Sequence, residues 1–218
     1  MDVAIIDYKM SNLHSVQAAC NKVGLNSIIT SNNDEILNST IAILPGVGAF
    51  GEAMNQIKAL RLDKTIKEFI NTGKQFVGIC LGLQLLFEKS EEFGDNEGLG
   101  IIKGVVRKFT PDHIGSTKFP VPQIGWNKIS INNLTWQNTL LNDNRNGDFM
   151  YFVHSYYVIP ENEEVILSNT IYGEVKYCSS IQQKNIFASQ FHPEKSGTVG
   201  LKIYENLKNI GINENEQS

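Results

Sequence analysis

A cysteine between two glycines is the first feature of this sequence that could do chemistry. The segment Gly78-Ile79-Cys80-Leu81-Gly82 has the G-x-C-x-G form of a nucleophile elbow, in which the reacting residue occupies a sharp turn between a strand and a helix. The glycines let neighbouring backbone approach closely, and the N-terminus of the following helix favours a thiolate. Cys80 is therefore a candidate nucleophile, although a small buried cysteine packed between glycines explains the pentapeptide equally well.

A histidine and a carboxylate near the C-terminus could activate such a thiol. His192-Pro193-Glu194 directly follows a strand-like segment. An imidazole can accept and return a proton near neutral pH, and a carboxylate bonded to one ring nitrogen turns the other nitrogen toward the nucleophile. Taken singly, this histidine is better explained as a strand-end residue beside a solvated carboxylate. Because a cysteine at one strand end and a histidine after another strand can meet over the same sheet edge, the motifs together predict a triad of Cys80, His192 and Glu194.

A glycine-rich loop follows another apolar run, in Leu44-Pro45-Gly46-Val47-Gly48-Ala49-Phe50. Its backbone N–H groups, at Gly46, Val47 and Gly48, could face a developing oxyanion. The N–H of Leu81, just after the cysteine, could join them. One such donor is typically worth ~3 to 4 kcal/mol of barrier. The loop lacks the G-x-x-x-x-G-K-[ST] pattern of a phosphate cradle, so an oxyanion or substrate role is favoured.

Composition excludes several other classes of function. The chain has 218 residues, of which 41% are hydrophobic and 19% charged, as expected of a soluble globular protein. With 19 basic against 23 acidic side chains, it has no cationic surface for nucleic acid, so no nucleic-acid partner is expected. The apolar runs fall far short of the ~20 residues of a membrane-spanning helix, so no membrane partner is expected either. No export signal is visible.

The cysteines bear on the compartment and on metal binding. The sequence holds three of them, Cys20, Cys80 and Cys178, an odd number at wide spacing. This pattern fits a reducing cytoplasm rather than a disulfide framework, so we expect a cytoplasmic protein. Neither C-x-x-C nor H-x-x-x-H spacing occurs, so we expect no metal site and no cofactor.

The elements that position the candidate residues alternate in the first half of the chain. Apolar runs over 3–6, 27–30, 41–44 and 75–79 are predicted strands, separated by predicted amphipathic helices. One predicted helix follows the glycine-rich loop and ends at Gly73. Its apolar residues face the core, and they are Met54, Ile57, Ile66, Phe69 and Ile70. This alternation is typical of βαβ units in a mostly parallel sheet, which carries catalytic groups at the carboxyl ends of its strands.

The second half of the chain has a different pattern. After about residue 100, short alternating runs separated by Pro, Gly and Asn predict antiparallel hairpins added to the first sheet. A last helix is predicted around Leu201, Tyr204 and Leu207, followed by a polar tail. We therefore predict a single α/β domain over residues 1–210 and a loose tail over 211–218.

Several segments, in a fixed order, resemble those of a known family. They are IIDYKMSNLHSV, LPGVGAFGEAM, GICLGLQLLF, IGWN, YFVHSYYV and FHPEKSG. Over nearly the whole chain the sequence resembles the class I (triad) glutamine amidotransferases, and most closely the glutaminase subunits of imidazole glycerol phosphate synthases. The resemblance implies a doubly wound α/β fold with helices on both faces of the sheet. It also implies Cys80 as nucleophile, His192 as base and Glu194 as its partner. Gln84 would help to hold the substrate glutamine, and the Gly46 to Gly48 loop would supply the oxyanion site.

The same resemblance implies a function. The chain would hydrolyse glutamine to glutamate through a thioester on Cys80 and deliver ammonia to a synthase (cyclase) subunit in histidine biosynthesis. Because no second catalytic set is evident, a partner chain is expected, with a (β/α)₈ barrel, in a heterodimer. The residues that the resemblance places at this interface are Asn12, Trp126, Asn127, Tyr151, His154 and Lys195.

Two segments depart from the family pattern. Asp7-Tyr8-Lys9-Met10-Ser11-Asn12 stands for the usual D-Y-G-M-G-N, and Pro122-Gln123-Ile124-Gly125-Trp126-Asn127 stands for P-H-M-G-W-N. Both lie where the family meets its synthase partner, so the acceptor stays open between a histidine precursor and a nucleotide-linked surface sugar. A stand-alone γ-glutamyl hydrolase and a non-catalytic binding subunit of the same fold are the alternatives from other classes.

Overall fold

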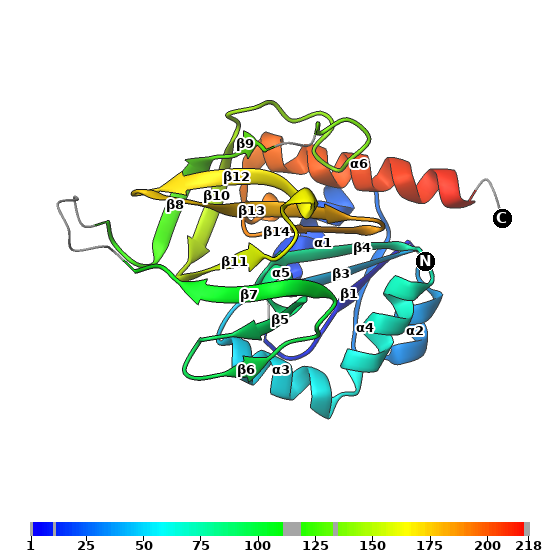
Figure 1. Ribbon diagram of the computed structural model, residues 1–218. Coiled ribbons are helices and arrows are strands. Elements are labelled where there is room, and N and C mark those ends of the chain that lie inside the picture. The colour runs from blue at the N-terminus through cyan, green and yellow to red at the C-terminus, as the bar shows by residue number, and fades with distance from the viewer. Residues whose placement is uncertain (1, 11, 111–118, 133–134, 216–218) are drawn as a thin grey trace.

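Short apolar runs form a parallel array at the centre of the computed structural model, which describes residues 2–10, 12–110, 119–132 and 135–215 (Figure 1). The array has the order β2-β1-β3-β4-β14, and each neighbouring pair is parallel. All but β2 are buried along their whole length, because helices cover both faces of the sheet. The strands are β1 (Val3–Ile6), β2 (Ser27–Thr30), β3 (Ile41–Gly46), β4 (Gln75–Cys80) and β14 (Ile186–Ser189).

The sheet continues beyond β14 with added strands whose neighbouring pairs are antiparallel, except that β5 and β7 are parallel. Its order runs on through β13, β11, β7, β5 and β6, while β12 pairs with β13, and β9 pairs with β12. These strands are β5 (Phe87–Ser90), β6 (Asn96–Glu97), β7 (Ile102–Lys108), β9 (Ser130–Ile131), β11 (Tyr156–Pro160), β12 (Ile166–Tyr172) and β13 (Val175–Gln183). The parallel centre with its mostly antiparallel extension confirms the predicted fold class.

Strands β8 (Gln123–Lys128) and β10 (Phe149–His154) form a separate two-stranded antiparallel sheet. The prediction that every hairpin of the second half extends the first sheet is therefore wrong for this pair. Its inner side packs on the main sheet, where the ring of Phe152 meets those of Tyr177 and Phe191. A strand that buries one face on another sheet alternates just as an added edge strand does, so the sequence pattern cannot separate the two arrangements.

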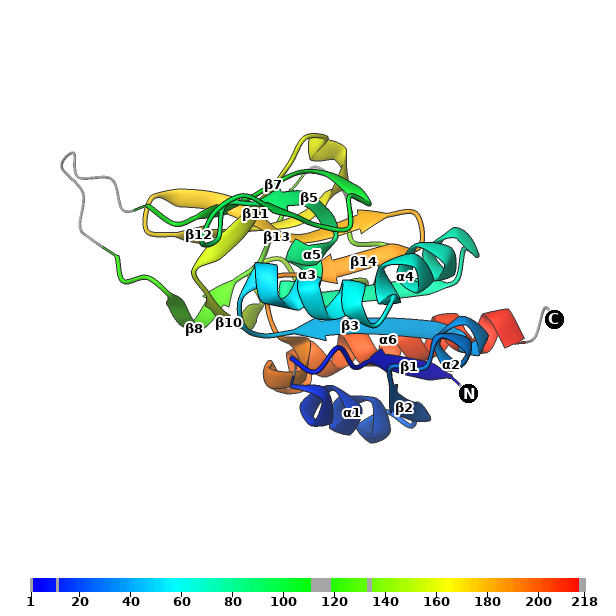
Figure 2. The same cartoon turned by 90° about the horizontal axis from the view of Figure 1, so that it is seen from below.

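Helices cover both faces of the parallel array (Figure 2). Helices α1 and α6 pack with one core cluster, which holds Val16 and Tyr204, and α2 to α5 pack with another, which holds Ile36, Ile57 and Leu83. This is the doubly wound arrangement that the family resemblance implied. The helices are α1 (Leu13–Lys22), α2 (Asn33–Asn38), α3 (Phe50–Ala59), α4 (Leu62–Asn71), α5 (Leu81–Leu85) and α6 (Gly197–Asn215), with 3₁₀ turns η1 (Glu163–Val165) and η2 (Pro193–Lys195).

Two helices differ in extent from the predictions. The single helix predicted to end at Gly73 is two helices, α3 and α4, because Arg61 adopts a left-handed conformation with φ 59° between them. Helix α6 runs to Asn215, into the segment 211–218 that was predicted as a loose tail, where no proline stops it; residues 216–218 lie outside the described residues. Among the described residues, no helix is both long and apolar enough to cross a membrane.

Candidate active site

Cys80 occupies the sharp turn that its motif predicts. It ends β4 and precedes α5, with φ 55° and ψ −106°, a conformation that costs a non-glycine residue roughly 1–3 kcal/mol. Neighbouring backbone leaves no room for side chains beside it, since a Cβ on Gly82 would lie 1.8 Å from the carbonyl oxygen of Leu44. A Cβ on Gly78 would lie 3.0 Å from the Cβ of Ala188. The strained turn is thus held by close packing on both sides.

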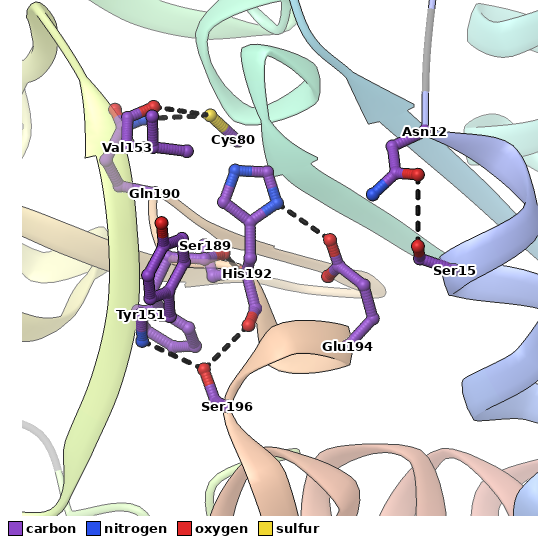
Figure 3. A network of polar contacts seen from close by, with 11 residues as sticks. Asn12, Ser15, Cys80, Tyr151, Val153, Ser189, Gln190, His192, Glu194 and Ser196 are labelled. Carbon is purple, nitrogen blue, oxygen red and sulfur yellow. Dashed lines mark hydrogen bonds and ion pairs between the residues drawn. The ribbon is translucent and has the colours of Figure 1, made fainter. Parts of the chain in front are cut away.

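The sheet brings His192 and Glu194 to the same edge. Strand β14 lies parallel to β4, with Ser189 opposite Ile79, so the residues after β14 reach the carboxyl end of β4 where Cys80 lies. Nδ1 of His192 lies 2.8 Å from Oε1 of Glu194, and both side chains are at most 2% exposed. Figure 3 shows the imidazole ring between the sulfur of Cys80 and the carboxylate of Glu194. The structure therefore brings the three predicted triad residues together.

The polypeptide around η2 fixes the position of this imidazole. The backbone N–H of His192 donates to the carbonyl oxygen of Tyr151 on β10 at 2.9 Å. Ser196 Oγ donates to the carbonyl oxygen of His192 at 2.6 Å and accepts the backbone N–H of Tyr151 at 3.0 Å. These bonds tie η2 to the β8–β10 sheet, so the ring cannot shift without moving β10.

Charges in the site favour a protonated His192. Burial by itself would lower the pKa of His192, but the negative charge of Cys80, contact with its sulfur, and the hydrogen bond and charge of Glu194 raise it to about 10. Nε2 of His192 is buried and has no hydrogen-bond partner among the described residues, yet the ring is close enough to Cys80 for a charge there to raise its pKa. The arrangement can therefore hold a thiolate and an imidazolium side by side, as nucleophilic cysteine chemistry requires.

A cavity of about 240 Å³ opens in front of Cys80. Among its lining residues are Val47, Gly48, Leu81 and Gln84, four of the five residues predicted to bind substrate. The fifth, Gly46, lies opposite Cys80 in the β3–β4 register, and a Cβ there would lie 2.3 Å from the hydroxyl of Tyr8. The cavity thus places a substrate-sized space directly against the thiol.

The glycine-rich loop lies at this cavity, but one of its donors is engaged elsewhere. The N–H of Val47 donates to the carbonyl oxygen of Met10 at 3.4 Å rather than pointing at Cys80. Gly48 has φ 101°, a conformation that glycine adopts without strain. The loop therefore has the position predicted for an oxyanion site, with its Val47 N–H turned away.

Two residues that sequence reasoning missed also belong to the site. Glu92 lines the cavity and accepts the backbone N–H of Phe50, the first residue of α3, at 2.6 Å, and burial raises its pKa. It lies in a loop of ordinary acidic residues, so nothing in the sequence distinguished it. Gln190 donates from Nε2 to the sulfur of Cys80 at 3.6 Å. Its separation from His192 by two residues could have indicated it, because alternate residues of an extended segment share a side.

The residues predicted at a partner interface divide into two groups. Trp126 and Tyr151 lie opposite each other across β8 and β10, and Trp126 is exposed. Asn12, Asn127 and Lys195 are also partly or fully exposed, whereas Ser11 lies outside the described residues.

His154 differs from the rest of that predicted set because it points inward. It is 6% exposed, lines the cavity and has Nδ1 2.8 Å from the carbonyl oxygen of Tyr156. Its ring is therefore largely enclosed by this chain. The alternation along β10 explains this, since His154 shares the inner side with the buried Met150 and Phe152. Among the described residues, no group of three His, Cys, Asp or Glu side chains could hold a metal ion.

Comparisons with known proteins identify the family of this chain. The family described as glutamine amidotransferase class-I matches residues 4–209. The chain is 46% identical to the imidazole glycerol phosphate synthase subunit HisH of Aquifex aeolicus, over 95% of this chain and 96% of that protein. It is 40% identical to the subunit of the same name from Bacillus subtilis, over 92% of each.

Solved structures show the same fold at lower sequence identity. The structure of PurLQS from Thermotoga maritima superposes with a TM-score of 0.72 at 18% identity, covering 95% of this chain and 97% of that one. The glutaminase domain of a Trypanosoma brucei CTPS superposes with a TM-score of 0.66 at 14% identity, covering 98% and 94%. With its elbow, its sheet order and its match over almost the whole length, this chain belongs to the class-I glutamine amidotransferase family.

Proposed function

We propose that this chain is a glutaminase in which Cys80 attacks glutamine, His192 transfers protons and Glu194 orients His192. The observation that carries the proposal is the buried imidazole between the sulfur and a carboxylate at 2.8 Å, beside a cavity that fits a small substrate. Membership of a glutamine amidotransferase family supports glutamine as the substrate.

The proposed reaction has two halves. The Cys80 thiolate attacks the side-chain amide carbon of glutamine, and the tetrahedral intermediate collapses as the C–N bond breaks and the His192 imidazolium protonates the leaving nitrogen. Ammonia leaves and a glutamyl thioester remains on Cys80. Neutral His192 then takes a proton from water, the hydroxide attacks the thioester, and the C–S bond breaks to give glutamate and the thiolate. The proton that His192 has taken from water regenerates its imidazolium form.

Substrate recognition follows from the charges that line the cavity. The free amino group of glutamine is cationic, and Glu92 is the carboxylate beside the cavity that can receive it. Both hydrogens of Gln84 Nε2 are used inside the protein, on Tyr156 O at 3.0 Å and Gln190 Oε1 at 3.1 Å, so Gln84 offers the substrate its Oε1. The Leu81 N–H, next to the nucleophile, is proposed as one oxyanion donor. The Val47 N–H would become a second donor only if its peptide turned away from Met10.

We further propose a synthase subunit as partner. The outer side of the β8–β10 sheet exposes Ile124, Trp126 and Phe149 at 64%, 55% and 49%, a large apolar exposure for a monomer. The same side leads to Val153, which lines the cavity, so a chain docked there would close over the site of ammonia release. Relatives at 40% and 46% identity are named as subunits of imidazole glycerol phosphate synthase. We propose that this chain serves that reaction in a heterodimer with a (β/α)₈ barrel, with Asn12, Asn127 and Lys195 at the rim.

Copurification and nitrogen transfer test this function. The chain is expressed with a synthase subunit of its own organism, and glutamine labelled in the amide nitrogen is supplied with candidate acceptors. We expect Cys80→Ala to abolish glutamine-dependent synthesis and to leave ammonia-dependent synthesis unchanged. Cys20→Ala, which removes a buried thiol of α1, is the control and should keep both activities. Glutamine hydrolysis by Cys80→Ala would contradict the proposal.

A further inference from the structure

Gln190 is held beside the nucleophile by the sheet itself. It follows Ser189, which lies opposite Ile79 on β4, so the next position in this parallel register lies beside Cys80. On its other side, its backbone N–H donates to the carbonyl oxygen of Ser179 at 2.9 Å. The side chain is fully buried. A polar amide in this place must satisfy its hydrogen bonds inside the protein.

A backbone carbonyl sets the direction of the hydrogen bonds that reach the sulfur. The oxygen of Tyr156 can only accept, so the atom of Gln84 that lies 3.0 Å from it is the amide nitrogen. The second hydrogen of that nitrogen reaches Gln190 at 3.1 Å and needs an acceptor, which is Oε1. The other end of the Gln190 amide, its NH₂ group, therefore faces Cys80 Sγ at 3.6 Å. The two hydrogen bonds of Gln84 Nε2 thus determine that Gln190 presents its NH₂ group, and not its oxygen, to the sulfur.

A donor aimed at the sulfur acts differently on the two forms of the cysteine. A thiol needs little from an N–H donor and can itself donate, here toward the carbonyl oxygen of Val153 at 3.9 Å. A thiolate only accepts, and a hydrogen bond to a charged group is stronger than one to a neutral group. The Gln190 amide therefore stabilises the thiolate relative to the thiol, from a direction other than that of His192 (Figure 3).

We propose that Gln190 is a further catalytic residue with two roles, in which its NH₂ group stabilises the Cys80 thiolate and its Oε1 holds Gln84 in the orientation that offers Oε1 to the substrate. The first role concerns Cys80 alone, whereas the second rests on the proposed function. The amide thereby couples the state of the nucleophile to the wall of the substrate cavity.

Two replacements of similar size separate the two roles. Gln190→Glu keeps an acceptor for Gln84 but removes the donor and puts an acidic group beside the sulfur. Gln190→Met removes both the donor and the acceptor. The matched control is Gln183→Glu, the same change at the far end of β13. Circular dichroism and thermal melting check that each full-length variant is folded.

The first readout does not depend on glutamine. Carbamidomethylation of Cys80 by iodoacetamide is followed by mass spectrometry between pH 5 and pH 9, with Cys80→Ala as the blank for Cys20 and Cys178. We expect both Gln190 variants to react about ten-fold or more slowly than the wild type at pH 7, with the pH profile moved to higher pH, because a hydrogen bond to a charged group is lost. Gln183→Glu should react like the wild type. A folded Gln190 variant with the wild-type profile would overturn the thiolate role.

The second readout is glutamine hydrolysis in the complex with the synthase subunit. We expect kcat to fall in both variants, and KM to rise in Gln190→Met well beyond its change in Gln190→Glu. An equal KM in the two variants would overturn the role of Oε1. If the wild type labels as expected but hydrolyses no glutamine, the proposed function fails while the contact between Gln190 and Cys80 stands. If the wild type hydrolyses glutamine and the variants do so equally well, the inference about Gln190 fails alone.

Discussion

Replacing His154 by glutamine tests how strongly the fold keeps this imidazole neutral. Burial lowers the pKa of His154 to about 3. The hydrogen bond to the Tyr156 carbonyl oxygen opposes this shift, and the charge of His192 adds to it. An unfolded histidine has a pKa of about 6.5. Between these values the unfolded chain binds a proton that the folded chain does not, so stability present above pH ~6.5 is lost as the pH falls. At about 1.4 kcal/mol per pH unit, the step from pH 6.5 to 5 costs about 2 kcal/mol.

Urea unfolding at pH 7 and pH 5 measures this contribution. We expect the free energy of unfolding to fall by about 2 kcal/mol more in the wild type than in His154→Gln between the two pH values, whatever the replacement costs at pH 7. His14→Gln removes an exposed histidine and should follow the wild type. If the wild type and His154→Gln lose stability equally on acidification, His154 is protonated in the folded protein and burial does not keep it neutral.

Two further predictions concern carboxylates of the site. Glu194→Gln removes a buried charge-assisted hydrogen bond worth about 1.5–3 kcal/mol, so kcat/KM for glutamine should fall roughly 10- to 150-fold. The control is Glu205→Gln, on the exposed side of α6, which should leave kcat/KM unchanged. A fall of less than three-fold would refute the role of Glu194. Glu92→Gln can still accept the Phe50 N–H but loses the charge for the substrate amino group, so KM should rise roughly 5- to 30-fold with kcat little changed. Glu91→Gln, one residue away, is its control, and an equal KM in both variants would exclude Glu92 from substrate binding.

The parts of the fold that the sequence predicts well are those set by local chemistry. Apolar runs such as 3–6 and 75–79 are typical of buried strands. Glycine is required at 82 because the carbonyl oxygen of Leu44 lies 1.8 Å from where a Cβ would be, and at 78 a Cβ would lie only 3.0 Å from the Cβ of Ala188. The triad was predictable for a topological reason. Residues that follow adjacent parallel strands meet at one edge of the sheet, and β4 and β14 are adjacent.

Other features depend on contacts that leave no periodic signal. Arg61 interrupts two helices whose apolar sides face the same core, so the repeat of apolar residues runs straight across the break. Glu92 owes its place to the return of a loop toward α3, which no local pattern records. The direction of the Val47 N–H depends on the competing acceptor at Met10, from a segment far away in the sequence. Such features follow from tertiary packing and cannot be read from spacing.

The neutrality of His154 and the charge of His192 belong to one electrostatic arrangement. His154 lines the same cavity as Cys80, and the charge of His192 is one of the causes that lower the pKa of His154. If both imidazoles were cations, each positive charge would lower the pKa of the other ring. Burial keeps His154 neutral, and its Nδ1 donates to Tyr156 O, the same oxygen that orients Gln84. Cys80 and the Glu194 carboxylate raise the pKa of His192, so in the proposed mechanism the ring that faces Cys80 carries the proton for the leaving nitrogen.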